Sequence, residues 1–236
     1  MKKIIPILLI GLCLYSCQSL LLKIISKKSI TKQVKVLERK ADNRTIVFMP
    51  MIHVGQKEYF ESAKPIIDSL RALNYKIYYE NIAITDSITT EETILYRKKA
   101  RKIMGFSFDN KEDTENSYGK PKKYITQDYN MMGLNRNDKI LDLGINRIID
   151  SIEKNNGVIK LSDCDINTPL KAEYKCENTL GDLNYAFTNT YRDPYILDHV
   201  LKDKNQKIVL IYGKMHWYFI YPSLIKNDFK LIKGKI

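Results

Sequence analysis

Two short and almost uninterrupted apolar runs limit the folds that this chain can adopt. They are TIVFM at Thr45–Met49 and KIVLIY at Lys207–Tyr212, near opposite ends of the sequence. Apolar runs of this length, without alternating polar residues, are typical of strands that are covered on both faces of a parallel sheet. Segments with helical patterns separate the two runs. We therefore predict an α/β fold with a central, mostly parallel sheet flanked by helices.

Weaker patterns complete this outline. A strand at 34–37 and turn-forming residues at 41–43 precede the first apolar run, which predicts an N-terminal β-hairpin. Asp193 and Pro194 have the chemistry of an N-cap and a first helical residue, so a helix is expected to begin there. Other expected helices begin near Ser62 and cover 90–104, 138–155, 180–191 and 217–225, the last with a break at Pro222, and other expected strands cover 76–84, 158–161 and 229–232.

The composition is that of a globular protein, because 44% of the 236 residues are hydrophobic and 28% are charged. The formal charge of +12 would, by itself, favour nucleic acid or an anionic membrane as a partner. The densest cationic run, Arg97–Lys102, has no interleaved aromatic residues and follows no nucleic-acid motif. We interpret it as a solvated helix face, with contact to anionic lipid as the alternative, and we expect no nucleic-acid partner.

The first 17 residues, MKKIIPILLIGLCLYSC, have the pattern of an export signal. Two lysines precede an apolar stretch of 11 residues, which is the length of a signal-peptide core and short for a membrane span. The stretch ends in Leu14-Tyr15-Ser16-Cys17, which is similar to a bacterial lipobox. We predict a lipoprotein of the bacterial cell envelope, held to the membrane by acyl chains on Cys17. The alternative is an uncleaved anchor that continues to Ile25, and both interpretations place the protein outside the cytoplasm.

This prediction divides the chain into three parts: a signal peptide at 1–16, a membrane-proximal tether at 17–32 and a single α/β domain at 33–236. Cys164 and Cys176 would then lie in an oxidising compartment, where they can form a disulfide. Two separate thiols are the alternative.

Two of the three histidines and one glutamate follow predicted strands directly. His53 follows the first apolar run, Glu80 ends the apolar part of the next strand, and His216 follows the second apolar run. The carboxyl ends of strands form the ligand crevice of open α/β sheets, so we expect these three side chains to converge. Imidazole and carboxylate bind divalent transition metals, and a site with three protein ligands leaves a position for a reactive water. We predict such a metal site, with hydrogen-bonded structural residues as the alternative.

The segments around these residues resemble TraB/Tiki-type proteins. IVFMPMIHVGQKEYFESAKPIIDSLRALNYKIYYEN is similar to the opening of that family, where a Gly-x-x-His motif is followed by a helix and by a strand ending in Glu. TYRDPYILDHVLKDKNQKIVLIYGKMHWYFIYPSLIKNDFKLI is similar to its end, and Gly213-x-x-His216 matches the second Gly-x-x-His motif fully. Pro50 stands where the family has the first glycine. The resemblance covers residues 33–84 and 187–235.

This resemblance implies a fold of the erythromycin esterase or haem-binding lipoprotein type, and a catalytic set of Glu80, His53, His216 and Arg192. Arg192 would hold Glu80 or a substrate carboxylate through a bidentate fork. The implied activity is metal-dependent hydrolysis of a peptide or ester. The alternative function is a lipoprotein that captures a peptide, haem or another small molecule without turnover.

Overall fold

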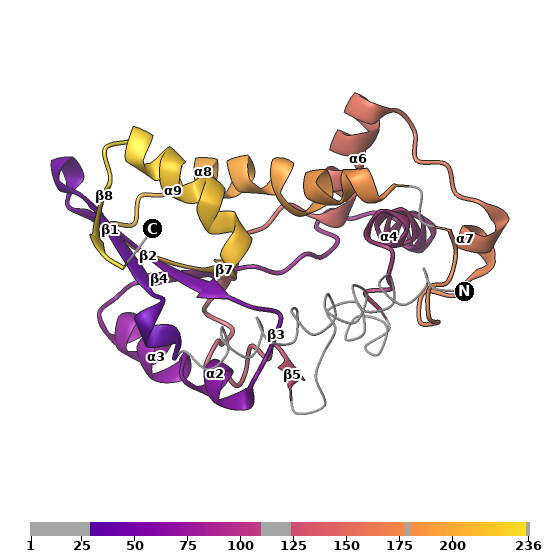
Figure 1. The fold of residues 1–236 in the computed structure, drawn as a ribbon. Helices are drawn as coiled ribbons and strands as arrows, with labels where there is room; N and C mark the ends of the chain where they lie inside the picture. The colour runs from indigo at the N-terminus through magenta and orange to yellow at the C-terminus, as the bar shows by residue number, and fades with distance from the viewer. Residues whose placement is uncertain (1–28, 110–123, 178–179, 235–236) are drawn as a thin grey trace, which may run out of the picture.

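The computed structural model describes residues 29–109, 124–177 and 180–234, and Figure 1 shows their arrangement. The predicted signal peptide and Cys17 lie outside these ranges. Ile30 in the short 3₁₀ helix η1 (Ile30–Lys32) is fully buried, so the end of the expected tether packs into the core. Within the described ranges, no helix has the length and apolar character needed to cross a membrane.

The two apolar runs lie side by side at the centre of a six-stranded sheet, whose order is β6-β4-β7-β2-β1-β8. They form β2 (Arg44–Met51) and β7 (Lys207–Gly213), which pair in parallel. Met51 lies opposite Gly213, so both strands reach their carboxyl ends at the same edge of the sheet. The predicted buried, parallel centre of the sheet is therefore confirmed.

The outer strands complete the sheet on both sides. β4 (Lys76–Tyr79) pairs in parallel with β7, and the short β6 (Lys139–Ile140) pairs in parallel with β4. On the other side, β1 (Lys35–Arg39) pairs antiparallel with both β2 and β8 (Lys230–Lys233). The sheet is thus mostly parallel, and β1 is the antiparallel strand among the described residues.

Helices cover both faces of the sheet (Figure 1). One face carries α2 (Lys57–Glu61) and α3 (Lys64–Ala72), and the other carries α8 (Arg192–Lys202) and α9 (Trp217–Lys226). Neighbouring residues of a strand point to opposite faces, so the central strands supply both hydrophobic cores. Toward α2 and α3 point Val47, Met49, Val209 and Ile211, and toward α8 and α9 point Ile46, Phe48, Ile208 and Leu210.

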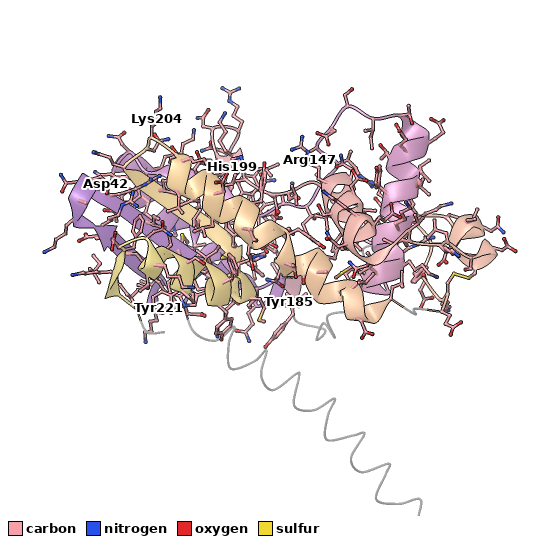
Figure 2. All side chains as sticks on the ribbon, turned by 90° about the horizontal axis from the view of Figure 1, so that it is seen from above. Asp42, Arg147, Tyr185, His199, Lys204 and Tyr221 are labelled. Carbon is pink, nitrogen blue, oxygen red and sulfur yellow. A yellow bond between two sulfur atoms is a disulfide. The ribbon has the colours of Figure 1, made fainter. Side chains whose placement is uncertain are left out.

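A third hydrophobic cluster lies beyond one end of the sheet (Figure 1). It joins α4 (Thr90–Met104) to α6 (Ile145–Asn156), and the short α7 (Asp163–Asn167) packs beside them. Cys164 and Cys176 form a disulfide here, visible in yellow in Figure 2. The structure therefore favours the disulfide over two separate thiols.

The remaining elements are short. The helical turn η2 (Lys40–Asp42) links β1 to β2, and η5 (Lys214–His216) links β7 to α9. β3 (Val54–Gly55) and β5 (Ile125–Thr126) form a separate two-stranded sheet.

Several predicted elements are wrong in part. The segment 158–161 is not a strand, because Ile159 is buried in the third cluster and its N–H donates to the Glu153 carboxylate at 2.8 Å. The strand predicted at 76–84 ends at Tyr79, and α6 begins at Ile145 rather than at 138. Helix α9 continues through Pro222. Proline removes the hydrogen bond to the carbonyl four residues earlier, and that residue is the exposed Tyr218.

The predicted helix at 180–191 divides into a 3₁₀ turn, η3 (Gly181–Leu183), and a π-helix, η4 (Ala186–Thr190). This π-helix leads directly into α8, which begins at Arg192, and Tyr191 before it is already helical. Asp193 is therefore not an N-cap, and its side chain is free to bond elsewhere.

The cationic run on α4 is not a solvated face. Arg101 and Lys102 are buried against the chain around α7. Arg101 donates to backbone carbonyls at 165, 168 and 169, and Lys102 pairs with the buried Asp165 at 2.6 Å. Lys99 pairs with Glu153 at 2.7 Å. These cations hold α4 to its neighbours, so the membrane-contact alternative loses most of its charges.

Candidate functional site

The predicted convergence at the strand ends is present. Glu80 follows β4 and extends it by one residue, because its N–H donates to the Ile211 carbonyl at 3.0 Å. His216 lies in η5, directly after β7, and His53 lies two residues beyond β2. All three residues line one pocket at the carboxyl edge of the parallel strands, as expected for an open α/β sheet.

Glu80 is buried and is bound on both carboxylate oxygens. Its Oε1 accepts from Nη2 of Arg192 at 2.7 Å and lies 3.2 Å from Nε2 of His216. Its Oε2 accepts from the N–H of Gly213 at 2.6 Å. A phenolic hydroxyl from Tyr129 also donates to the Glu80 backbone carbonyl at 2.6 Å. The carboxylate is thus fixed by two cationic side chains and by the backbone N–H of Gly213 at the end of β7.

Arg192 makes its bidentate contact with a different residue from the one predicted. Its Nε and Nη2 contact the two oxygens of Asp142 at 2.8 and 2.7 Å, and Nη1 donates to the Thr188 carbonyl at 2.9 Å. Only Nη2 reaches Glu80. The fork expected on Glu80 is therefore on Asp142, and Arg192, which is 1% exposed, links two buried carboxylates.

Asp193 completes this network from the other side. Its Oδ1 contacts Nδ1 of His216, and its Oδ2 accepts from the side-chain amide of Asn189 at 3.3 Å. His216 therefore lies between two carboxylates, Asp193 on Nδ1 and Glu80 on Nε2. We call the buried set Glu80, Asp142, Arg192, Asp193 and His216 the charge network.

The network changes the protonation of its members. Burial by itself would lower the pKa of His216, but the hydrogen bonds with Asp193 and Glu80 raise it to about 9. Burial would also raise the pKa of Glu80, but the bond to His216 and the charge of Arg192 hold that pKa well below its ordinary value. At neutral pH the network therefore contains an imidazolium, a guanidinium and ionised Glu80.

His53 differs from these residues because it is exposed. A Cβ atom on Gly213 would lie 3.1 Å from Oε2 of Glu80, 3.7 Å from the His216 ring and 3.8 Å from Nε2 of His53. The glycine thus stands where the three predicted residues meet. Any side chain at this position would occupy the centre of the site.

The pocket has a volume of about 880 Å³, which is within the range of small-molecule sites. His53 and three members of the charge network, Glu80, Arg192 and His216, line it together with apolar side chains from Ile82, Met104, Phe106, Phe108 and Phe187. Met215 and Tyr185 also line it, and both are largely exposed. Figure 2 shows Tyr185 and His199 on opposite sides of the molecule, so His199 lies away from the pocket.

The charge network does not fit a metal ion as its side chains lie. Both ring nitrogens of His216 face carboxylates, so neither nitrogen points into open space where a metal could bind. A divalent cation at Glu80 would also stand beside the Arg192 guanidinium. Within the described residues, no group of three or more His, Cys, Asp or Glu is arranged to hold a metal.

No protein-family model, curated protein sequence or solved structure matches the chain. The TraB/Tiki resemblance therefore stays a prediction, and the site is interpreted from its own geometry.

Sequence reasoning missed Asp142 and Asp193 as members of the site. Asp142 comes two residues after β6, so the strand-end argument that selected Glu80 would also have selected it had β6 been recognised. Asp193 was assigned to helix capping because a helix start before proline is its commonest use. Its position next to Arg192 in the sequence is the signal that could have pointed to the network.

Proposed function

We propose that this protein is a hydrolase of ester or peptide bonds, and that it acts through His53 and the charge network. One observation carries the proposal: the exposed imidazole of His53 lies near a buried Glu80–His216–Arg192 cluster, and all of them line a pocket of about 880 Å³. Buried, paired charges at a strand-end crevice are typical of sites that stabilise charge during a reaction.

The reaction would begin with a water molecule that attacks the substrate carbonyl carbon. His53 takes a proton from this water, since imidazole is the usual general base near neutral pH. The carbonyl oxygen gains negative charge, which the positive charge of the nearby His216 imidazolium stabilises through space. The bond to the leaving group then breaks, and the proton held by His53 passes to that group. The products are a carboxylic acid and an alcohol or amine.

The proposal is tested by incubating the purified protein with a 4-nitrophenyl ester and with a fluorogenic peptide. We expect steady product formation that continues over many turnovers. Glu80→Gln should reduce kcat by about 100-fold or more, because its neutral amide removes one of the two carboxylates that keep His216 charged. The absence of turnover with both substrates would contradict the proposal.

A divalent metal at His53, Glu80 and His216 is the second form of this hydrolase, favoured by the meeting of two imidazoles and a carboxylate at Gly213. It would require His216 to lose its proton and Glu80 to leave Arg192. Elemental analysis of the purified protein, together with activity before and after chelation, separates the two forms. We expect less than about 0.1 equivalent of metal per chain, and activity after chelation that equals the activity before it.

A binding lipoprotein without turnover is the second function, favoured by the mutual neutralisation of the charge network. Such a protein would capture a peptide, haem or another small molecule in the same pocket. Saturable binding without product formation would support this function over the hydrolase.

We also propose that the chain is a lipoprotein of the cell envelope, anchored at Cys17. The Cys164–Cys176 disulfide supports this location, because structural disulfides persist mainly in oxidising compartments. Finally, we propose the erythromycin esterase or haem-binding lipoprotein fold with an N-terminal β-hairpin. Its support is the antiparallel pairing of β1 with β2 across the turn η2.

A further inference from the structure

Three aromatic rings form a continuous apolar wall in the lining of the pocket. The ring centroids of Phe106 and Phe108 lie 4.9 Å apart, and Phe108 stacks with Phe187 at 6.1 Å with an interplanar angle of 22°. Phe187 is fully buried, but Phe108 is 40% exposed. Large apolar side chains that line a pocket and keep exposed area are candidates for contact with a ligand.

This wall is connected rigidly to the charge network. The π-helix η4 carries Phe187, and the next two residues on it contact the network: Thr188 accepts from Arg192 at 2.9 Å, and Asn189 donates to Asp193 at 3.3 Å. π-helical turns are rare and occur frequently at functional sites. A molecule lying on the wall would therefore have a fixed position relative to His53 and Glu80.

One cation that is not part of the network also lines the pocket. Lys214 directly follows Gly213 and precedes the exposed Met215. The pocket thus combines an apolar wall, a reactive centre and a cationic side chain. A molecule with an apolar tail and an anionic head matches these three features, and hydrolysis of an acyl ester produces such a molecule.

We propose that the substrates are esters of apolar carboxylic acids, with the acyl group lying on the Phe106–Phe108–Phe187 wall. The carbonyl lies beside His53 and Glu80, and the carboxylate formed by hydrolysis lies toward Lys214. Water adds to the carbonyl, the acyl–oxygen bond breaks, and the alcohol leaves with a proton. This inference rests on the proposed hydrolase function and specifies its substrate class.

The test compares 4-nitrophenyl acetate, butyrate and octanoate, which share one leaving group. Each CH₂ group that becomes buried on the wall should raise kcat/KM by about fourfold. Octanoate has six more CH₂ groups than acetate, so burial of only two of them should already raise kcat/KM by about 15-fold. Phe108→Ser should bring the octanoate-to-acetate ratio close to one. Because the ratio is measured on one preparation, partial loss of folded protein does not change it.

Phe219→Ser is the matched control, since Phe219 is 37% exposed on α9 and does not line the pocket. It should keep the wild-type ratio. Equal loss of selectivity in both variants would overturn the assignment of the acyl group to this wall. Turnover with the same kcat/KM along the series would also overturn the inference and leave the hydrolase function standing.

Calorimetric titration with sodium octanoate distinguishes the remaining outcomes. Octanoate that binds with a dependence on Phe108, in a protein without turnover, supports the acyl site and contradicts the hydrolase function. If the protein shows neither turnover nor octanoate binding, both the acyl site and the hydrolase function are overturned.

Discussion

Glu80 is the residue on which the other charges of the site depend. It is shared by Arg192 and His216, which face each other as like charges across its Oε1 atom. Removing one partner of a buried ion pair costs about 3–5 kcal/mol because the other charge stays buried without compensation. The stability of the fold therefore depends on the protonation of His216.

His216 makes that stability depend on pH. Its pKa is raised from about 6.5 to about 9, so its contribution is fully present below pH 6.5 and is lost as the pH rises toward 9. This contribution is about 3 kcal/mol. Glu80 acts in the opposite direction: its pKa is lowered, so its contribution is lost as the pH falls below about 4.5.

Urea unfolding should therefore be measured at pH 6, 7.5 and 9.5. The free energy of unfolding should fall more between pH 6 and pH 9.5 in the wild type than in His216→Gln. Glutamine can donate its amide hydrogens to a carboxylate but does not titrate. A wild-type protein and variant with parallel pH profiles between pH 6 and 9.5 would show that His216 is neutral in the folded state.

Gly213 is predicted to be needed for its lack of a side chain. In Gly213→Ala, the added methyl group would lie 3.1 Å from the Glu80 carboxylate, which is closer than ordinary contact. We expect kcat/KM to fall by about tenfold or more, while the melting temperature changes by less than about 4 °C. Full activity in this variant would place the reaction elsewhere in the pocket.

At the scale of elements, the sequence predicted the parts of the fold that have strong periodicity. β2, β7 and α4 were found because apolar runs and capping chemistry dominate them locally. The segment 158–161 was misassigned because a short apolar run looks the same in a strand as in a buried loop. β6 has two residues and carries no periodicity, so Asp142 could not be placed at a strand end.

Tertiary contacts decided the other differences. The cationic run on α4 is polar enough for a solvent-exposed face, but carbonyls and carboxylates from a distant segment bury it. Asp193 could act as a cap, but the preceding π-helix satisfies the start of α8, and His216 uses the carboxylate instead. Both outcomes depend on partners far away in sequence.

The disulfide should stabilise the elements around α7. Cys164 and Cys176 are 12 residues apart, and closing a loop of this size contributes about 3 kcal/mol. Replacing both cysteines with serine should lower the melting temperature by several degrees and leave esterase activity close to that of the wild type. An unchanged melting temperature, or an equal shift when dithiothreitol is added to the double variant, would contradict this assignment.

At the scale of the whole molecule, we expect an envelope protein whose pocket is loaded from outside the cytoplasm. Metabolic labelling with a palmitate analogue should mark the wild-type chain, and the labelled chain should be found in the membrane fraction. Cys17→Ser should lose the label, whereas Cys13→Ser should keep it. Labelling of the Cys17→Ser chain would instead support acylation at another cysteine, and an unlabelled wild-type chain in the membrane fraction would support an uncleaved anchor.

We propose that His53 and the charge network hydrolyse the substrate, and variants of the two exposed histidines test this claim. The measurement is kcat for 4-nitrophenyl octanoate in the wild type, in His53→Ala and in His199→Ala. His199 is exposed on α8 and does not line the pocket, so it controls for the loss of an imidazole. We predict that His53→Ala loses about 100-fold or more in kcat and that His199→Ala keeps the wild-type value. Equal activity of His53→Ala and the wild type would contradict the claim.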